Sequence, residues 1–193
     1  MARPLRTYDL DDASVQVLAH PLRLRLLGLL RADGPATATR LAERVDESSG
    51  VTSYHLRKLA EAGFVEEDQS RGTKRERWWR ASHDATRFSA ANFLGDPDAH
   101  RASLAIRREM NRWQQRLVEQ WLAEEPDWDK SWADAAGASD ALLRLTAAQT
   151  KALHEEIFSV VRRYRDNEAP EDDPDAARVV WFQHLIPVRE LPY

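Results

Sequence analysis

Residues 37–80 constrain the fold of this chain more than any other stretch. Apolar residues recur there first with the spacing of a helix and later in short strand-like runs. In order, the segment contains a short helical run (38–45), a polar turn (46–49), a second helical run (50–62) and two strand-like pieces (64–67 and 75–80). The segment therefore predicts two helices joined by a tight turn and followed by a β-hairpin, which is the order of a winged helix-turn-helix.

The second helical run carries its own start and stop signals. Ser48 or Ser49 is a good N-cap, because its hydroxyl can accept a hydrogen bond from a free backbone N–H of the first turn. Gly63 stands where a helix end favours a residue that tolerates the left-handed conformation. A stripe at helical spacing is expected to face a core: Thr52, Leu56 and Leu59.

The opposite face of this helix carries short hydroxyl groups, a phenol and two cations, with no carboxylate before Glu61. The major groove of DNA admits an α-helix, and such side chains can meet base edges and phosphates there. The alternative is an ordinary solvated surface helix. The candidate DNA-contacting residues of this helix are Ser48, Ser49, Val51, Thr52, Ser53, Tyr54, Arg57 and Lys58.

The predicted hairpin has a basic tip at residues 69–75. A basic tip beside a groove-reading helix is placed to touch phosphates or to enter the minor groove. The alternative is an exposed hairpin with ordinary surface charge. The candidate contacts of this wing are Arg71, Lys74 and Arg75.

Two short sequence motifs in the first half of the chain resemble those of a known family. Residues 18–27 (LAHPLRLRLL) resemble the opening helix of ArsR-like winged-helix repressors, and residues 51–59 followed by 62–65 resemble their recognition segment. The resemblance spans about residues 13–82 and implies a winged helix-turn-helix that binds DNA. The chain has no cysteine, so it departs from the metal-sensing members of that family.

Composition limits the class of protein further. The 193 residues are enough for one larger domain or two small ones, and no apolar run approaches the roughly 18 residues of a membrane span. The N-terminus lacks the apolar core of a signal peptide, so a cytoplasmic location is expected. The net charge of −4 divides into +2 for residues 1–95 and −6 for residues 96–193. DNA affinity depends on local patches rather than on this total.

The second half predicts a connector at residues 83–97 and a long helix at 98–124. The apolar residues of that helix have nearly coiled-coil spacing, which suits either a dimer interface or a core within the domain. A strand at 140–145, a helix at 147–164 and a strand at 178–186 together predict a small α+β element. The proline inside the opening helical run, Pro21, is expected to bend or restart that helix.

No enzymatic constellation stands out. The chain has no Gly-rich phosphate loop or zinc-protease spacing, and its six histidines are scattered, so neither catalysis nor a bound metal or cofactor is expected. His20 and His55 are interpreted as packing residues, with a DNA role open for His55. Aromatic residues are concentrated in the C-terminal half and suit a core, a dimer interface or a small-molecule pocket. The candidates for an effector site or dimer interface are Met110, Trp113, Leu117, Trp121, Trp128, Trp132 and Trp181.

The sequence thus predicts a mainly α-helical protein with small β elements. Residues 1–82 form a winged helix-turn-helix, residues 83–97 a connector, and residues 98–193 a region for dimerisation and possible effector binding. The predicted function is a homodimeric DNA-binding repressor that recognises an imperfect palindrome. The alternative is a winged-helix module that binds protein instead of DNA.

Overall fold

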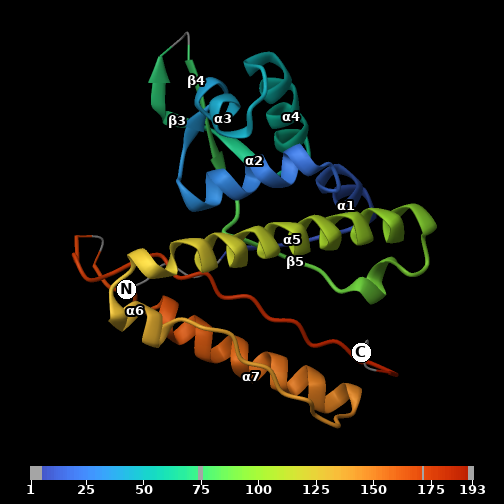
Figure 1. Ribbon diagram of the computed structural model, residues 1–193. Coiled ribbons are helices and arrows are strands. Elements are labelled where there is room, and N and C mark those ends of the chain that lie inside the picture. Colours follow the sequence, from blue (N-terminus) through green and yellow to red (C-terminus); the bar gives the residue numbers. More distant parts are fainter. Residues whose placement is uncertain (1–5, 74–75, 171, 191–193) are drawn as a thin grey trace. The chain divides into compact units, whose positions relative to one another are not determined.

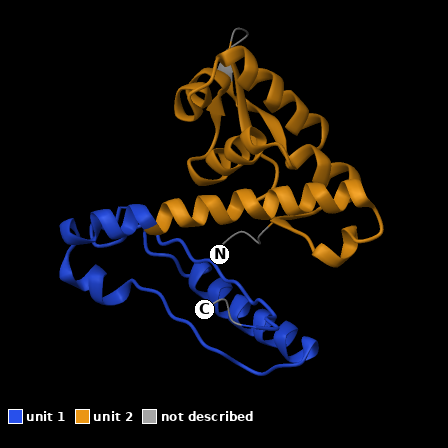
Figure 2. Cartoon of the chain, turned by 45° about the vertical axis from the view of Figure 1, so that its right-hand side comes forward, with its two compact units in different colours: residues 1–3, 119–193 blue, residues 4–118 orange. Residues whose placement is uncertain are grey.

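The computed structural model of the chain describes residues 6–73, 76–170 and 172–190. The fold is mainly helical with small strands, as predicted (Figure 1). The chain divides into two compact units, and the division falls inside the longest helix, after Val118 (Figure 2). Residues 4–118 form the N-terminal unit and residues 119–193 make up most of the other.

The N-terminal unit combines helices with two small sheets. Its elements are β1 (Thr7–Asp9), α1 (Asp12–Leu18), α2 (Pro21–Ala32), β2 (Ala36–Thr37), α3 (Ala38–Val45), α4 (Ser49–Glu61), β3 (Val65–Thr73), β4 (Glu76–Ala81), β5 (Ala85–Arg87), a 3₁₀ turn η1 (Ala90–Phe93) and the first part of α5 (Pro97–Glu124). Strands β2, β4 and β3 form an antiparallel sheet, and β1 pairs in parallel with β5. The predicted long helix is confirmed as α5.

Proline separates the first two helices instead of bending one of them. Helix α1 begins with a capping box, in which the Asp11 carboxylate accepts from the Ser14 backbone and the Ser14 hydroxyl caps Asp11 in return. Helix α2 begins at Pro21, where the missing N–H costs nothing because the first N–H groups of a helix have no partner within the helix. His20 is its N-cap, and its Nδ1 accepts from the Leu22 backbone N–H at 3.2 Å.

Local caps fix the turn between α3 and α4. Helix α3 ends at Asp46, which takes the left-handed conformation with φ of 56°. Two residues later, the Ser48 hydroxyl accepts from the Val51 N–H and caps α4. At the other end of α4, the Phe64 N–H donates to the Leu59 carbonyl at 2.9 Å. The preceding residue, Gly63, has a φ of +76°. This is a Schellman motif, and the stop predicted at Gly63 is confirmed.

One apolar core holds the N-terminal unit together. Leu26, Leu56, Leu59 and Phe64 are almost fully buried, and the first four helices and the sheet all contribute to this core. Ile106 of α5 joins the same cluster with an exposed fraction of 1%. The first turns of α5 therefore belong to the N-terminal unit.

The C-terminal unit contains the end of α5, the 3₁₀ turn η2 (Glu125–Asp127), α6 (Lys130–Ala135) and α7 (Ala147–Arg165). Helix α7 begins with the predicted capping box, in which Thr146 and Gln149 cap each other. The predicted strands at 140–145 and 178–186 are wrong, since both segments are unpaired among the described residues, and the α+β element does not form. β-Branched and aromatic residues favour a strand only where a partner strand supplies the hydrogen bonds.

Candidate nucleic-acid interface

Helix α4 has a free face that carries exposed side chains. Val51 and Tyr54 are 41% and 47% exposed, although both are large and apolar or aromatic. Ser49 and Arg57 are exposed on the same helix, and Ser53 is half-buried. Within this unit, α4 and the β3–β4 hairpin lie at the end farthest from α5 (Figure 1). Helix α4 and the described strands of the hairpin can therefore approach one partner surface together.

Thr52 does not belong to this free face. Its side chain is fully buried, and its Oγ1 has no hydrogen-bond partner among the described residues. The helical spacing that buries Leu56 and Leu59 also turns Thr52 inward. Its inclusion among the DNA-contacting residues is corrected: Thr52 is a core residue.

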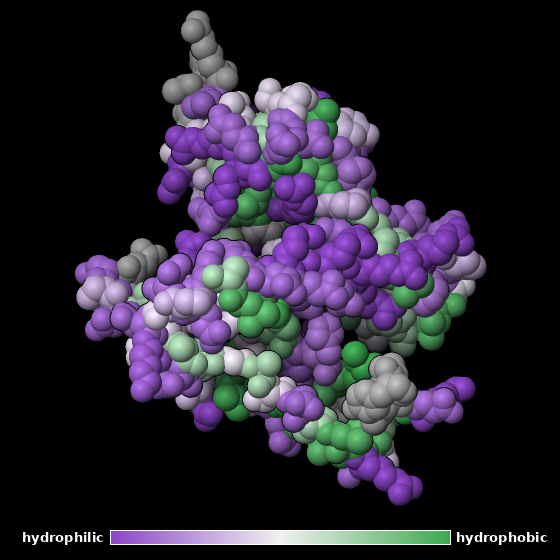
Figure 3. Space-filling model, viewed as in Figure 1, coloured by the Kyte–Doolittle hydropathy of each residue, from purple (hydrophilic) through white to green (hydrophobic). Residues whose placement is uncertain are grey.

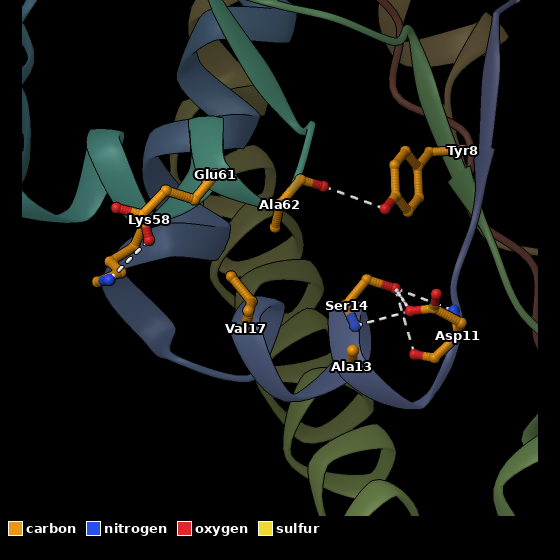
Figure 4. A pocket seen from close by; sticks show the side chains of 8 residues that line it. All are labelled: Tyr8, Asp11, Ala13, Ser14, Val17, Lys58, Glu61 and Ala62. Carbon is orange, nitrogen blue, oxygen red and sulfur yellow. Dashed lines mark hydrogen bonds and ion pairs between the residues drawn. The ribbon is translucent and has the colours of Figure 1, made fainter.

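Lys58 is engaged in an ion pair. Its Nζ lies 2.6 Å from the Glu61 carboxylate, and this hydrogen bond raises the pKa of Lys58 above its usual value. Both side chains border a pocket of about 490 Å³ that Tyr8 and Asp11 also line (Figure 4). By contrast, Arg57 is exposed and makes no ion pair with any described residue, so it is the cation of α4 that is available to a phosphate.

The stem of the hairpin is largely neutralised by pairs across its strands. Arg77 lies 3.2 Å from Glu67, and Arg80 lies 3.0 Å from Glu66. Toward the tip, Arg71 is 3.8 Å from the Asp68 carboxylate and is 57% exposed. The remaining wing candidates, Lys74 and Arg75, lie outside the described residues.

Two tryptophans anchor the hairpin on different sides. Trp79 is buried in the core with an exposed fraction of 6%, whereas Trp78 is half-buried. The Arg40 guanidinium lies 4.9 Å from the centre of the Trp78 ring, within the range of a cation–π contact. Sequence reasoning missed Arg40, because no local pattern links α3 to the strand that carries Trp78.

Two histidine rings meet where the start of α2 approaches α4. The rings of His20 and His55 are 4.4 Å apart, and the Arg23 Nε donates to the His55 Nδ1 at 3.3 Å. Burial is the main cause that lowers the pKa of each imidazole, and Arg23 lowers both further. The interpretation as a packing residue fits His55, which is buried, whereas His20 is exposed. Arg23 had no signal in the sequence, because it meets His55 across 32 residues of chain.

Part of the chain is similar to a known protein family. A family model described as "Helix-turn-helix domain" matches residues 18–68. These residues run from the end of α1 into β3 and include the whole α3–turn–α4 segment.

Residues 18–68 are similar to a helix-turn-helix domain.

Several solved structures are similar over parts of the chain. One, described as a possible transcriptional regulator for arsenical resistance, is 29% identical and covers 57% of this chain and 97% of its own, with a TM-score of 0.32. The homodimeric winged helix-turn-helix DNA-binding domain of Mb0332 from Mycobacterium bovis, a possible ArsR-family regulator, is 21% identical over 58% of this chain and 82% of its own, with a TM-score of 0.32. ZitR from Lactococcus lactis is 12% identical over 75% of this chain and 81% of its own, with a TM-score of 0.31. No curated protein matches the chain.

The matched residues 18–68 lie within the part of the chain that carries the resemblance to ArsR-like regulators. A helix-turn-helix is a DNA-binding module, and its second helix is the one that enters the major groove. Here the second helix is α4, whose free face is described above. DNA binding is therefore the activity that this part of the chain supports.

Outside the helix-turn-helix domain, the predicted effector or dimer residues are divided between the two compact units. Met110 and Trp113, each 45% exposed, and the half-buried Leu117 lie on the part of α5 that belongs to the N-terminal unit. The remaining four, which belong to the C-terminal unit, include a chain of rings with centroids 6.0 and 5.8 Å apart, formed by Trp121, Trp128 and Trp132, and the 43% exposed Trp181. No described helix is long and apolar enough to cross a lipid bilayer. The described residues hold no cluster of metal-ligating side chains.

Proposed function

We propose that the chain is a homodimeric transcriptional repressor that binds an imperfect DNA palindrome. Helix α4 enters the major groove, and the wing at residues 69–75 lies on the backbone or in the minor groove. The observation that carries this proposal is the free face of α4, on which Val51 and Tyr54 are exposed beside Arg57, a cation without an ion pair among the described residues. Such a cation together with bulky exposed side chains suits a negatively charged, deeply grooved ligand.

The residues of this face divide into two roles. Side chains that can meet base edges are Ser49, Val51, Ser53 and Tyr54, and these would determine which sequence is bound. Arg57 and the wing residue Arg71 would contact phosphates, which position the protein without reading sequence. Lys74 and Arg75 are proposed as further phosphate contacts from their position in the sequence alone.

Dimerisation is proposed for the C-terminal unit. None of the described residues from 119 to 190 is buried, although this region contains many large apolar side chains. Hydrophobic side chains come to the surface over α7 and the C-terminal segment (Figure 3). A region of this size that buries nothing lacks a core of its own, and a second copy of the chain is the partner that could supply one.

A twofold dimer determines the form of the DNA site. Two copies of α4 would enter successive major grooves about 10 base pairs apart, so the two half-sites should be inverted copies of each other. Repression would follow where such a site overlaps a promoter, because the bound dimer occupies the DNA that the polymerase needs.

Selection of bound duplexes from a random pool tests the proposal. We expect the full-length protein to select an imperfect inverted repeat. Tyr54→Ala should alter the selected sequence, because the phenol is a base-edge contact. If Tyr54→Ala weakens binding equally on every duplex, its role in reading sequence is wrong.

A pair of charge-matched variants tests the phosphate role. Arg57→Ala should weaken binding about equally on all duplexes. It should also reduce the dependence of log affinity on log salt by about two, because the dimer loses one phosphate contact in each subunit. Arg101→Ala removes the same charge from α5, where Arg101 pairs with Asp98, and should leave binding unchanged. Equal effects of the two variants would show that only net charge matters.

The alternative function, a winged-helix module that binds protein, draws support from the net charge of −4 and from the neutralised hairpin stem. It predicts no binding to random duplex DNA even at low salt. Titration of the protein with random duplex DNA at low salt therefore separates the two functions.

A further inference from the structure

A groove of about 550 Å³ lies within the N-terminal unit between α2 and α5. Its apolar lining includes Leu24 of α2, Phe88 after β5, and Ile106, Met110 and Trp113 of α5. This volume is in the range of sites that hold small organic molecules, and an aromatic and aliphatic lining is typical of them. The free face of α4 is not part of this groove, so its ligand is separate from DNA.

A glycine in the middle of a helix keeps the groove open. Gly28 lines it from α2, and a Cβ at this position would meet no atom within 4 Å. Glycine inside a helix lowers stability by roughly 0.5–1 kcal/mol relative to alanine. Helix α2 is therefore slightly destabilised at the position that borders the groove. Almost any larger side chain at this position would project into the groove.

The charged residues of the lining are mostly cations. Four arginines, from α2, α3 and α5, border the groove with a single carboxylate, Glu109. That carboxylate is already shared by Arg112 and Arg116 of the same helix. The four arginines are Arg25, Arg31, Arg44 and Arg116.

Two of these arginines retain capacity for an anion. Arg25 is exposed and makes no ion pair with a described residue. Arg31 donates to the backbone carbonyl of His83 at 3.0 Å and to the Thr86 hydroxyl at 2.8 Å, both of which are neutral. Burial lowers the pKa of Arg31 to about 10, and the charge of Asp84 only partly offsets this effect. A negative group in the groove would compensate the charge of Arg31, whose hydrogen-bond acceptors here are neutral.

We propose that this groove binds a small organic acid with an apolar body. Its carboxylate would pair with the arginines of α2, Arg25 and Arg31, and its body would lie against Ile106, Met110 and Trp113. Arginine binds carboxylates with charge-assisted hydrogen bonds. The apolar wall favours a ligand with a hydrophobic body over a small inorganic ion.

This site goes beyond DNA binding, and one consequence rests on the proposed function. Arg44 and Val45 line the groove and end α3, directly before the turn that leads to α4. A bound acid would therefore contact the helix-turn-helix domain and bias its affinity for DNA. The binding test itself needs no DNA, so its failure and the failure of the proposed function can be told apart.

Calorimetric titration of the full-length protein tests the site. Decanoate and 1-naphthoate are the probes, and decanol is the uncharged counterpart. We expect both acids to bind, and decanol to bind at least about tenfold more weakly, because it lacks the charge that the arginines recognise. Failure of both acids to bind, or equal binding of decanol and decanoate, would overturn the proposal.

Three variants locate the binding. Gly28→Phe should fill the groove and abolish binding of decanoate, whereas Gly28→Ala adds one methyl group and should retain it. Arg25→Gln, at an exposed position that cannot disturb the core, should weaken decanoate about tenfold and leave decanol unchanged. Unchanged decanoate affinity in a folded Gly28→Phe, or in Arg25→Gln, contradicts the proposal.

A second copy of the chain is the competing occupant of the groove. In that case Gly28→Phe would change the oligomeric state measured by sedimentation, and decanoate would not bind to the unmodified protein. That combination would overturn the ligand site and identify the groove as an interface. The proposal predicts the same oligomeric state for the unmodified protein and the Gly28→Phe variant.

Discussion

Gly63 ends α4 in a backbone conformation that other residues adopt only with strain. A Cβ added at Gly63 would lie 3.7 Å from the Tyr8 ring, which is an ordinary contact distance. The energetic cost of a side chain therefore comes from the backbone, whose φ is +76°. We expect Gly63→Ala to lower the free energy of unfolding by about 1–2 kcal/mol in a urea titration. Gly28→Ala is the matched control, because its helical position should make the same substitution stabilising by roughly 0.5–1 kcal/mol. Equal effects of the two would contradict this explanation.

The adjacent imidazoles of His20 and His55 make stability depend on pH. Burial lowers the pKa of both, and for His55 the charge of His20 is the next cause, followed by Arg23. The unfolded chain, with imidazoles near 6.5, therefore binds more protons than the folded chain between the lowered pKa values and 6.5. Stability should be fully present above pH 6.5 and fall as the pH decreases through that window.

Urea unfolding at pH 5.5 and pH 7.5 measures this effect. The unmodified protein should be less stable at pH 5.5, and the double replacement His20→Gln with His55→Gln should reduce the difference. Ordinary carboxylates titrate mostly below this range and contribute little to the comparison. A difference of the same size in the double variant would show that other groups cause it.

At the scale of residues, part of the candidate site could be predicted. Helical spacing identified the stripe that contains Thr52, and the same spacing should have excluded Thr52 from the DNA-contacting set. Glu61 stands three residues after Lys58, so their ion pair was also accessible from the sequence. The contact of Arg23 with His55 was not, because it depends on how α2 and α4 pack.

At the scale of elements, the hairpin is secured mainly by one of its two tryptophans. Trp79 enters the core, whereas Trp78 stays half-buried under Arg40. Trp79→Ala should therefore lower the free energy of unfolding by about 3–5 kcal/mol, the usual range for a large aromatic side chain in a core. Trp78→Ala, on the opposite face of β4, should cost clearly less. Chemical denaturation of both variants tests this order, and a reversed order would contradict the observed register of β4.

Helices were easier to predict than strands for a physical reason. The signals that begin and end α3, α4 and α7 lie within a few residues of each helix, as the caps at Thr37, Ser48 and Thr146 show. A strand needs hydrogen bonds from a segment elsewhere in the chain. Residues 178–186 have the composition of a strand, but no strand among the described residues pairs with them.

At the scale of the whole molecule, the C-terminal unit has an apolar surface that a second copy would cover. If it does, unfolding must depend on concentration, because only the folded chain associates. A hundredfold increase in protein concentration, measured from well above the dissociation constant, should stabilise the dimer by about 2.7 kcal/mol and raise its melting temperature. Sedimentation should show the mass of a dimer at the higher concentration.

Two matched substitutions place the interface. Ile186→Asp introduces a charge at a 70% exposed apolar position of the C-terminal unit and should weaken association. Leu94→Asp makes the same change at a 69% exposed position of the N-terminal unit and should not. A monomer at every concentration, or a dimer that only Leu94→Asp weakens, would contradict dimerisation through residues 119–190.

The proposed binding of DNA by α4 and the wing can be tested through the salt dependence of binding to a random duplex. Fluorescence anisotropy of a labelled duplex should report binding at 50 mM salt. If the dimer neutralises about six phosphates, affinity should fall by about 10³-fold at 200 mM salt. No binding at 50 mM salt, or an affinity that salt leaves unchanged, would contradict the claim.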